Sequence, residues 1–148
     1  MKKIKKQQEN IILFIWMIQY PKQKNNILQS RLQSAKLLQQ SLNDIPNHVK
    51  GIVCASAIGY YGNRNDLVDE KSEKGKGFLA DTVEAWENAN KNYPERTVIF
   101  RFGNVLATSG GVLAELIKPL NFFINPFLGG GQQMFSWIHI DDLCNMII

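Results

Sequence analysis

One stretch near the middle of the chain constrains its fold more than any other: residues 51–63, which read GIVCASAIGYYGN. A short apolar run opens this stretch, and small residues, Ser56 and two tyrosines follow. The apolar run is typical of a buried parallel strand. Ligands bind outside the carboxyl ends of the strands in open α/β sheets. We therefore expect a functional site where this strand ends, at Ser56.

The segments around this strand alternate between helical and strand patterns. In 25–42 apolar residues recur at helical spacing, namely Leu28, Leu32, Ala35, Leu38 and Leu42. The later pattern predicts helices over 78–93 and 112–117 and strands over 97–102 and 134–140. Loops are expected over 63–77, 103–111 and 125–133. Pro119 should end or kink the helix before it, and Asp141 can cap a last helix. Such alternation indicates an α/β fold with a parallel sheet.

The charge of the chain is concentrated at its start. Residues 1–36 hold eight Lys or Arg and one acid (8 − 1 = +7), and the remainder holds nine basic and twelve acidic residues (9 − 12 = −3). A basic arm can bind nucleic acid or an anionic membrane. No aromatic residues interleave with the first lysines and no nucleic-acid motif follows, so we expect neither partner.

Residues 1–20 form a basic and apolar N-terminal segment that resembles parts of a signal peptide. The apolar run IILFIWMI is too short to span a bilayer, and no small-residue cleavage site follows it. We expect a cytoplasmic protein, with organellar or secretory targeting left open.

Cysteine and histidine usage points away from disulfides and metals. The two cysteines, Cys54 and Cys144, lie far apart in apolar surroundings, which predicts buried thiols in a reducing compartment. His48 and His139 are isolated, so no metal site is expected. A lone histidine in a strand, such as His139, is more often structural than catalytic.

The residues for dinucleotide chemistry are incomplete. No Gly-x-Gly-x-x-Gly phosphate loop occurs. A reductase also needs a tyrosine and a lysine one helical turn apart, because the lysine lowers the pKa of the phenol. Phe78 and Thr82 stand where that pair is expected, and Tyr20–Lys24 is unsuitable because Pro21 interrupts it and it precedes the serine strand. Tyr60 and Tyr61 are possible substitutes, although packing of a turn explains them equally well.

Five ordered motifs together resemble the extended short-chain dehydrogenase/reductases, and more closely their sugar-nucleotide epimerase-like branch within the NAD-dependent epimerase/dehydratase family. They are ENI at 9–11 with Trp16 and ILQSRLQSAKLL at 27–38, CASAIGYYG at 54–62, GFLADTVEAWENA at 77–89, RFGNVLATSGGVLAEL at 101–116 and GGGQQMFSWIHIDDL at 129–143. The resemblance covers nearly the whole chain from about Glu9.

The resemblance implies an NADP-binding (or NAD-binding) Rossmann-like domain acting on a nucleotide sugar or a similar carbonyl or alcohol substrate. Carried over by position, Arg31 would contact the cofactor's phosphate region, Ser56 would lie near the nicotinamide and Val105 would touch the cofactor. Asn26 stands where the family often has an acid or another polar contact. Ser56 and Tyr60 are then the candidate catalytic residues. The family commonly lacks the tyrosine–lysine pair, so Phe78 and Thr82 are not aberrant within it.

The family's first four strands, with their glycine loop, would precede Glu9, and its substrate-binding part would follow Ile148. We therefore expect a partial Rossmann-like doubly wound parallel sheet without its first strands, with residues 21–148 as the C-terminal part of the domain. Such a fragment would bind the cofactor weakly or not at all. It would also leave an exposed edge at strand 51–57, which residues 11–18 could cover. Two functions stay open: part of an epimerase or oxidoreductase, or a non-catalytic Rossmann-like binding or interaction module.

Overall fold

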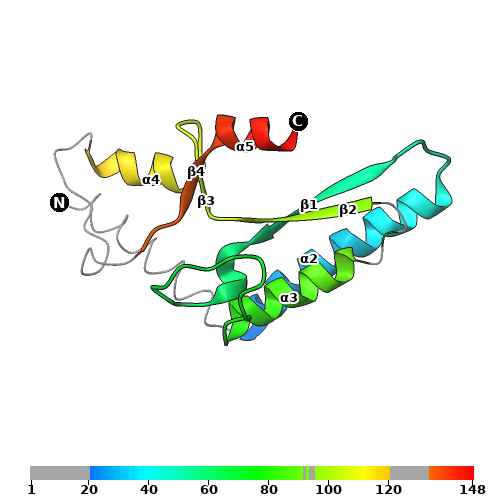
Figure 1. Ribbon diagram of the computed structural model, residues 1–148, viewed down its shortest axis with the longest axis horizontal. Helices are drawn as coiled ribbons and strands as arrows, with labels where there is room; N and C mark the ends of the chain where they lie inside the picture. Colours follow the sequence, from blue (N-terminus) through cyan, green and yellow to red (C-terminus); the bar gives the residue numbers. More distant parts are fainter. Residues whose placement is uncertain (1–20, 92, 94–95, 121–133) are drawn as a thin grey trace.

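The computed structural model describes residues 21–91, 93, 96–120 and 134–148. The elements follow in the order α2 (Pro21–Asp44), β1 (Gly51–Ala57), the 3-10 helix η1 (Ile58–Tyr61), α3 (Phe78–Asn90), β2 (Arg96–Phe102), β3 (Asn104–Leu106), α4 (Gly111–Leu120), β4 (Trp137–His139) and α5 (Ile140–Ile147) (Figure 1). Helices and strands alternate through most of the chain, as predicted.

Strands β1 and β2 form the main parallel pair. Gly51 pairs with Arg96 at one end of the register and Ala57 pairs with Phe102 at the other. Both strands therefore end at the same edge, which confirms the prediction that segments 51–57 and 97–102 run side by side in one direction. The open α/β arrangement puts the turn after β1 and the turn after β2 next to each other.

Helices α2 and α3 lie together on one face of this strand pair (Figure 1). Their residues meet in the same order along both helices, because the Lys24 ammonium lies 5.4 Å from the centre of the Phe78 ring and the Arg31 guanidinium carbon lies 5.2 Å from the centre of the Trp86 ring. The two helices therefore run parallel to each other. Leu38, one of the apolar residues at helical spacing in α2, is 43% exposed, whereas Ala35 is 4% exposed.

The opposite face of β1 and β2 is open in the described part of the chain. Side chains alternate between the two faces of a strand, and Cys54 and Ser56 are buried while Val53 and Val98 are 48% and 40% exposed. Among described residues β1 pairs only with β2, which agrees with the expected exposed edge. The segment 11–18 that was expected to cover it lies outside the described residues.

A second small parallel sheet follows directly after β2. The segment 103–111 was expected to be a loop, but β3 within it pairs with β4. The Asn104 amide donates to the Ser136 carbonyl at 2.9 Å. A Cβ on Gly103 would lie 2.8 Å from that carbonyl oxygen, so the glycine permits the close approach of the two segments.

Several predicted boundaries are corrected by the structure. The N-cap of α5 is His139, whose Nδ1 accepts a hydrogen bond from the Asp141 amide at 3.3 Å, instead of Asp141 itself. Helix α3 ends at Asn90 instead of residue 93, and α4 continues over Pro119 to Leu120. Cys144 is exposed, so only Cys54 is a buried thiol.

Some predictions concern residues that the structure does not describe. The N-terminal segment 1–20 and the loop 125–133 lie outside the described ranges, and the division of the chain at residue 20 stays a prediction. Within the described ranges, no helix combines the length and apolar character needed to cross a membrane. The same ranges contain no group of three or more His, Cys, Asp or Glu side chains that could hold a metal ion.

Candidate functional site

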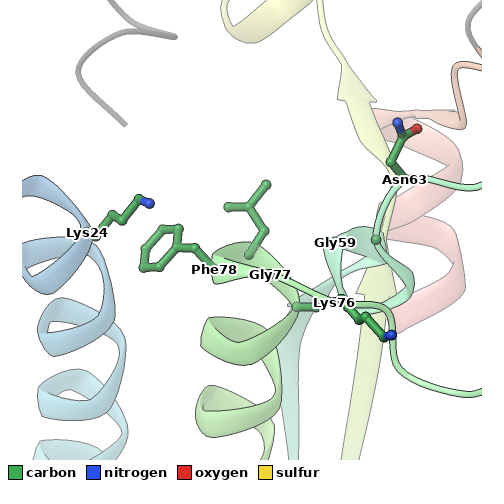
Figure 2. A pocket seen from close by; sticks show the side chains of 9 residues that line it. Lys24, Gly59, Asn63, Lys76, Gly77 and Phe78 are labelled. Atoms are coloured by element: carbon green, nitrogen blue, oxygen red, sulfur yellow. The ribbon is translucent and has the colours of Figure 1, made fainter. Parts of the chain in front are cut away.

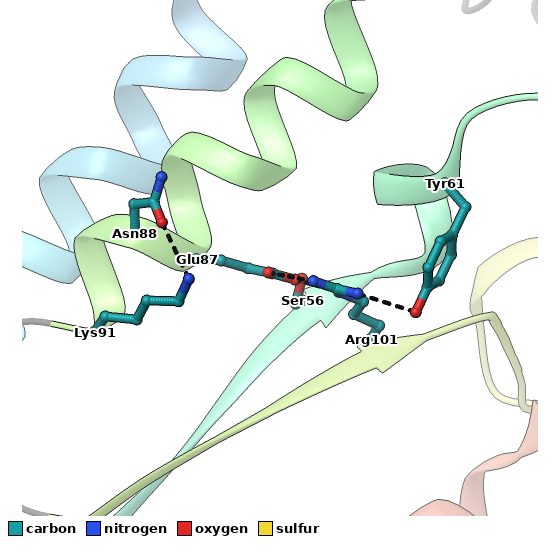
Figure 3. Close-up of polar contacts among 6 residues, drawn as sticks. All are labelled: Ser56, Tyr61, Glu87, Asn88, Lys91 and Arg101. Carbon is teal, nitrogen blue, oxygen red and sulfur yellow. Dashed lines mark hydrogen bonds and ion pairs between the residues drawn. The ribbon is translucent and has the colours of Figure 1, made fainter. Parts of the chain in front are cut away.

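The carboxyl ends of β1 and β2 meet helix α3 at a buried ion pair. The carboxylate of Glu87, on α3, accepts hydrogen bonds from Arg101 Nε at 2.7 Å and from Arg101 Nη2 at 2.8 Å. The Ser56 hydroxyl, on β1, donates to Glu87 Oε1 at 2.6 Å (Figure 3). One carboxylate therefore connects both strands to the helix above them.

The tyrosine turn packs against the other side of the same guanidinium. Arg101 Nη1 donates to the Tyr61 hydroxyl at 3.0 Å, and the Arg101 guanidinium carbon lies 3.5 Å from the centre of the Tyr60 ring. The two tyrosine rings meet edge to face with centroids 5.4 Å apart. These contacts support the view that the tyrosines pack the turn after β1.

Burial and hydrogen bonding act in opposite directions on Glu87. The residue is 4% exposed, and burial favours its neutral form, but hydrogen bonds from Arg101 and Ser56 outweigh burial and lower the pKa of Glu87 below its ordinary value. The hydrogen bond to Glu87 is the main reason that the pKa of Arg101 is raised. At neutral pH the pair is ionised, so Ser56 can only donate to the carboxylate.

The structure brings together two of the sequence-predicted site residues. Ser56 is 4% exposed and Tyr60 is half-buried, and Arg101 and Glu87 connect them. Arg31 stacks on Trp86, and Val105 pairs with Ile138 between β3 and β4. In the described part of the chain, neither Arg31 nor Val105 joins the hydrogen bonds and ring contacts of Ser56 and Tyr60. Their cofactor roles stay predictions, as do the catalytic roles of Ser56 and Tyr60.

Sequence reasoning missed the two charged residues at the centre of the site. Glu87 and Arg101 both belong to the motifs that carried the resemblance, but neither received a role. A signal was present, because Arg101 interrupts an apolar strand and Glu87 follows the buried Val83 by one helical turn. A charge at a buried position requires an opposite charge nearby, but only the fold shows that these two residues are partners.

Phe78 and Thr82 occupy the positions on α3 where a reductase would carry its tyrosine and lysine. Thr82 is 6% exposed and faces the interior, one turn after Phe78. The Lys24 ammonium, which comes from α2, lies 5.4 Å from the centre of the Phe78 ring. A cation therefore lies beside position 78, where the chain has a phenylalanine in place of a tyrosine.

Comparison with known proteins identifies relatives of this chain. No family model matches the chain. The epimerase family protein SDR39U1 homolog, chloroplastic, of Arabidopsis thaliana is 39% identical over 134 residues, which are 86% of this chain and 38% of that protein. An epimerase family protein of Staphylococcus aureus (strain NCTC 8325 / PS 47) is 36% identical over 135 residues, which are 86% of this chain and 44% of that protein.

Solved structures agree with these relatives. The crystal structure of human epimerase family protein SDR39U1 (isoform 2) with NADPH has a TM-score of 0.78 and 30% identity, over 87% of this chain and 45% of that chain. The nucleoside-diphosphate sugar epimerase from Corynebacterium glutamicum has a TM-score of 0.71 and 31% identity, over 86% of this chain and 28% of that chain.

The fold is therefore an α/β fold of the Rossmann-like type with a partial parallel sheet, as predicted. The homologues of the chain are epimerase family proteins, which confirms the family resemblance drawn from its motifs. The chain spans less than half the length of the curated relatives described above.

Proposed function

We propose that this chain is part of the cofactor domain of an NAD(P)-dependent epimerase-like oxidoreductase, with NADP as the expected cofactor and a nucleotide sugar or a similar carbonyl or alcohol compound as substrate. The observation that carries the proposal is the shared edge where β1 and β2 end, with Ser56 and the tyrosine turn at that edge. Similarity to a human relative solved with NADPH supports the choice of cofactor.

The residues fit one half of a dinucleotide site. Ligands of open α/β sheets lie beyond the carboxyl ends of the strands, and Ser56 near the end of β1 and Val105 just after β2 are suited to that position. The pyrophosphate half normally needs a glycine-rich turn between a first strand and its helix, and no Gly-x-Gly-x-x-Gly occurs in the 148 residues. Arg31 is engaged with Trp86, and a phosphate contact from it remains part of the proposal.

A nicotinamide cofactor, when bound, would supply or accept the hydride. The residues of this chain would orient the reactants: Tyr60 offers a hydroxyl at the turn, and Ser56 offers only acceptor lone pairs, because its proton is donated to Glu87. The Arg101 guanidinium holds the Tyr60 ring in place. Phe78 cannot exchange a proton, so a tyrosine acid at that position is not part of the proposed chemistry.

The alternative function is a non-catalytic Rossmann-like binding or interaction module. Two observations favour it: the buried Ser56 hydroxyl donates its proton to Glu87, and Phe78 and Thr82 replace the acid–base pair of a reductase. Under either function we propose a small-molecule ligand without nucleic-acid or membrane partners, and a cytoplasmic location. The Arabidopsis relative is described as chloroplastic, so expression of a tagged chain tests the location.

Fluorescence titration with NADPH and NADH separates the two functions. Because the glycine turn is absent, we expect the chain alone to bind NADPH weakly. A chimera that adds the preceding part of the S. aureus relative should bind NADPH in the micromolar range. Failure of a folded chimera to bind either cofactor, while the intact relative binds, would favour the interaction module.

A further inference from the structure

Strand β1 has a free edge in the described part of the chain. It pairs with β2 on one side only. The backbone N–H and C=O groups on its other side therefore have no strand partner among the described residues. Residues 51–57 contain neither a charge nor a proline, two devices that commonly keep an edge strand from pairing. This edge is therefore suited to a further strand.

Helix α2 is also incompletely covered by the described residues. It packs against α3, and α3 in turn packs on β1. Ala35 is the only buried residue of α2. The other apolar residues at helical spacing are less covered: Leu38 is 43% exposed, and Leu28, Leu32 and Leu42 are half-buried. An amphipathic helix of an α/β fold normally buries its apolar stripe against a sheet, and a strand beside β1 would extend the sheet beneath α2.

The start of α2 lies at the edge where β1 and β2 end. Lys24, in the first turn of α2, and Gly59, in the turn after β1, line one cavity together with Phe78 (Figure 2). A segment that leads into α2 through a short connection therefore has its own carboxyl end at this edge. As a strand, such a segment would run parallel to β1.

The connection through α2 also selects which edge such a strand would join. Helices α2 and α3 lie on the same face of β1 and β2 (Figure 1). A crossover into β1 through α2 has the same hand as the crossover from β1 to β2 through α3 only if its first strand lies on the free side of β1. Because crossovers between parallel strands are right-handed in about 98% of cases, the position beside β1 is favoured over the free side of β2.

The sequence before α2 has the composition of a strand in a parallel sheet. Residues 11–18 read IILFIWMI, and only Gln19 and Tyr20 separate them from α2. Continuous runs of apolar, β-branched and aromatic residues are typical of such strands. Eight residues span about 26 Å as a strand, which is close to the length of the seven-residue β1. A connection of two residues is also usual between a strand and the helix that follows it.

We propose that residues 11–18 form a third parallel strand on the free edge of β1, beneath α2. Gln19 and Tyr20 then follow the carboxyl end of this strand, at the edge that carries Ser56, so they join the candidate ligand site. The inference does not rest on cofactor binding. It does not follow from the family resemblance either, because the resemblance places the family's fourth strand before Glu9.

The test is NMR spectroscopy of the full 148-residue chain. We expect nuclear Overhauser effects between backbone protons of residues 11–18 and 51–57 in the pattern of parallel strands, and slow exchange of the β1 amides that point away from β2. Ile15→Asp places a carboxylate within the apolar run and should speed the exchange of these amides at least about tenfold, because a buried charge weakens the pairing. Ile4→Asp, the same substitution outside the run, is the matched control and should leave their exchange unchanged.

The same measurements distinguish this strand from a second copy of the chain at the β1 edge. Pairing of two copies through β1 would make the slow exchange depend on chain concentration, and Ile15→Asp would not affect it. That result overturns the proposal, as do fast exchange of the same amides in the folded parent chain and an absence of contacts between residues 11–18 and 51–57. The contacts in the parent chain decide the question even if Ile15→Asp does not fold. Failure of the chimera to bind NADPH would overturn the proposed function without affecting this result.

Discussion

Glu87 and Arg101 form a two-point ion pair, with Arg101 Nε and Nη2 lying 2.7 and 2.8 Å from the two oxygens of the same carboxylate. Their side chains are 5% and 20% exposed. The pair joins α3 to the end of β2, and the hydroxyl of Ser56 adds β1. The Glu87 carboxylate therefore couples α3 to both strands.

Breaking this pair should be costly. Glu87→Gln removes the charge but nearly preserves the shape, and it leaves the Arg101 guanidinium without its counterion. We expect the free energy of unfolding to fall by about 3 kcal/mol, measured by urea denaturation with tryptophan fluorescence. Glu115→Gln, which removes an exposed partner of Lys118, is the control and should change stability within error. Equal effects of both variants would contradict a stabilising role for the buried pair.

The pair should also make stability depend on pH. The folded-state pKa of Glu87 lies below its ordinary value of 4.5, so the folded chain holds this proton less tightly than the unfolded chain does. The resulting stabilisation is complete above pH 4.5 and is lost as the pH falls through the lower folded-state pKa. Denaturation of the parent chain and Glu87→Gln between pH 7 and pH 3 should show the difference shrinking towards acid. A constant difference would argue against ionic stabilisation by Glu87.

The two cysteines should differ sharply in reactivity. Cys54 is buried, and burial raises the pKa of its thiol, whereas Cys144 is exposed on α5. Because the thiolate is the reactive form, a disulfide reagent such as DTNB at pH 8 should modify one thiol in a fast phase and the other only on unfolding. Cys144→Ser should abolish the fast phase. Persistence of the fast phase in that variant would show that Cys54 is accessible.

The glycine at position 75 should not tolerate a side chain. A Cβ there would lie 2.3 Å from the Tyr61 carbonyl oxygen and 2.6 Å from the Gly62 nitrogen, and backbone atoms cannot move aside easily. We expect Gly75→Ala to lower the free energy of unfolding by about 1–3 kcal/mol. Gly110→Ala is the control, because a Cβ there would meet nothing within 4 Å. Thermal denaturation of the two variants measures the difference.

Elements with a strong local pattern were predicted well. The apolar run 51–57 became β1 over the same residues, and the helical spacing around Trp86 became α3 from the predicted first residue. The pairing of the two main strands also followed from sequence, because alternating helices and strands favour parallel neighbours. In contrast, β3 consists of three residues after Gly103, and so short a strand exists only because β4 lies beside it.

The amino-acid sequence therefore decided the class of fold, the resemblance to epimerase family proteins and the position of Ser56 at a strand end, because spacing and motifs are properties of neighbouring residues. The tertiary structure alone decided the chemistry around Ser56, since Glu87 and Arg101 are separated from it and from each other along the chain and meet only when α3 packs over β1 and β2. It likewise brought Lys24 to Phe78 from another helix. Burial makes such charged contacts strong and specific, and burial depends on the whole fold.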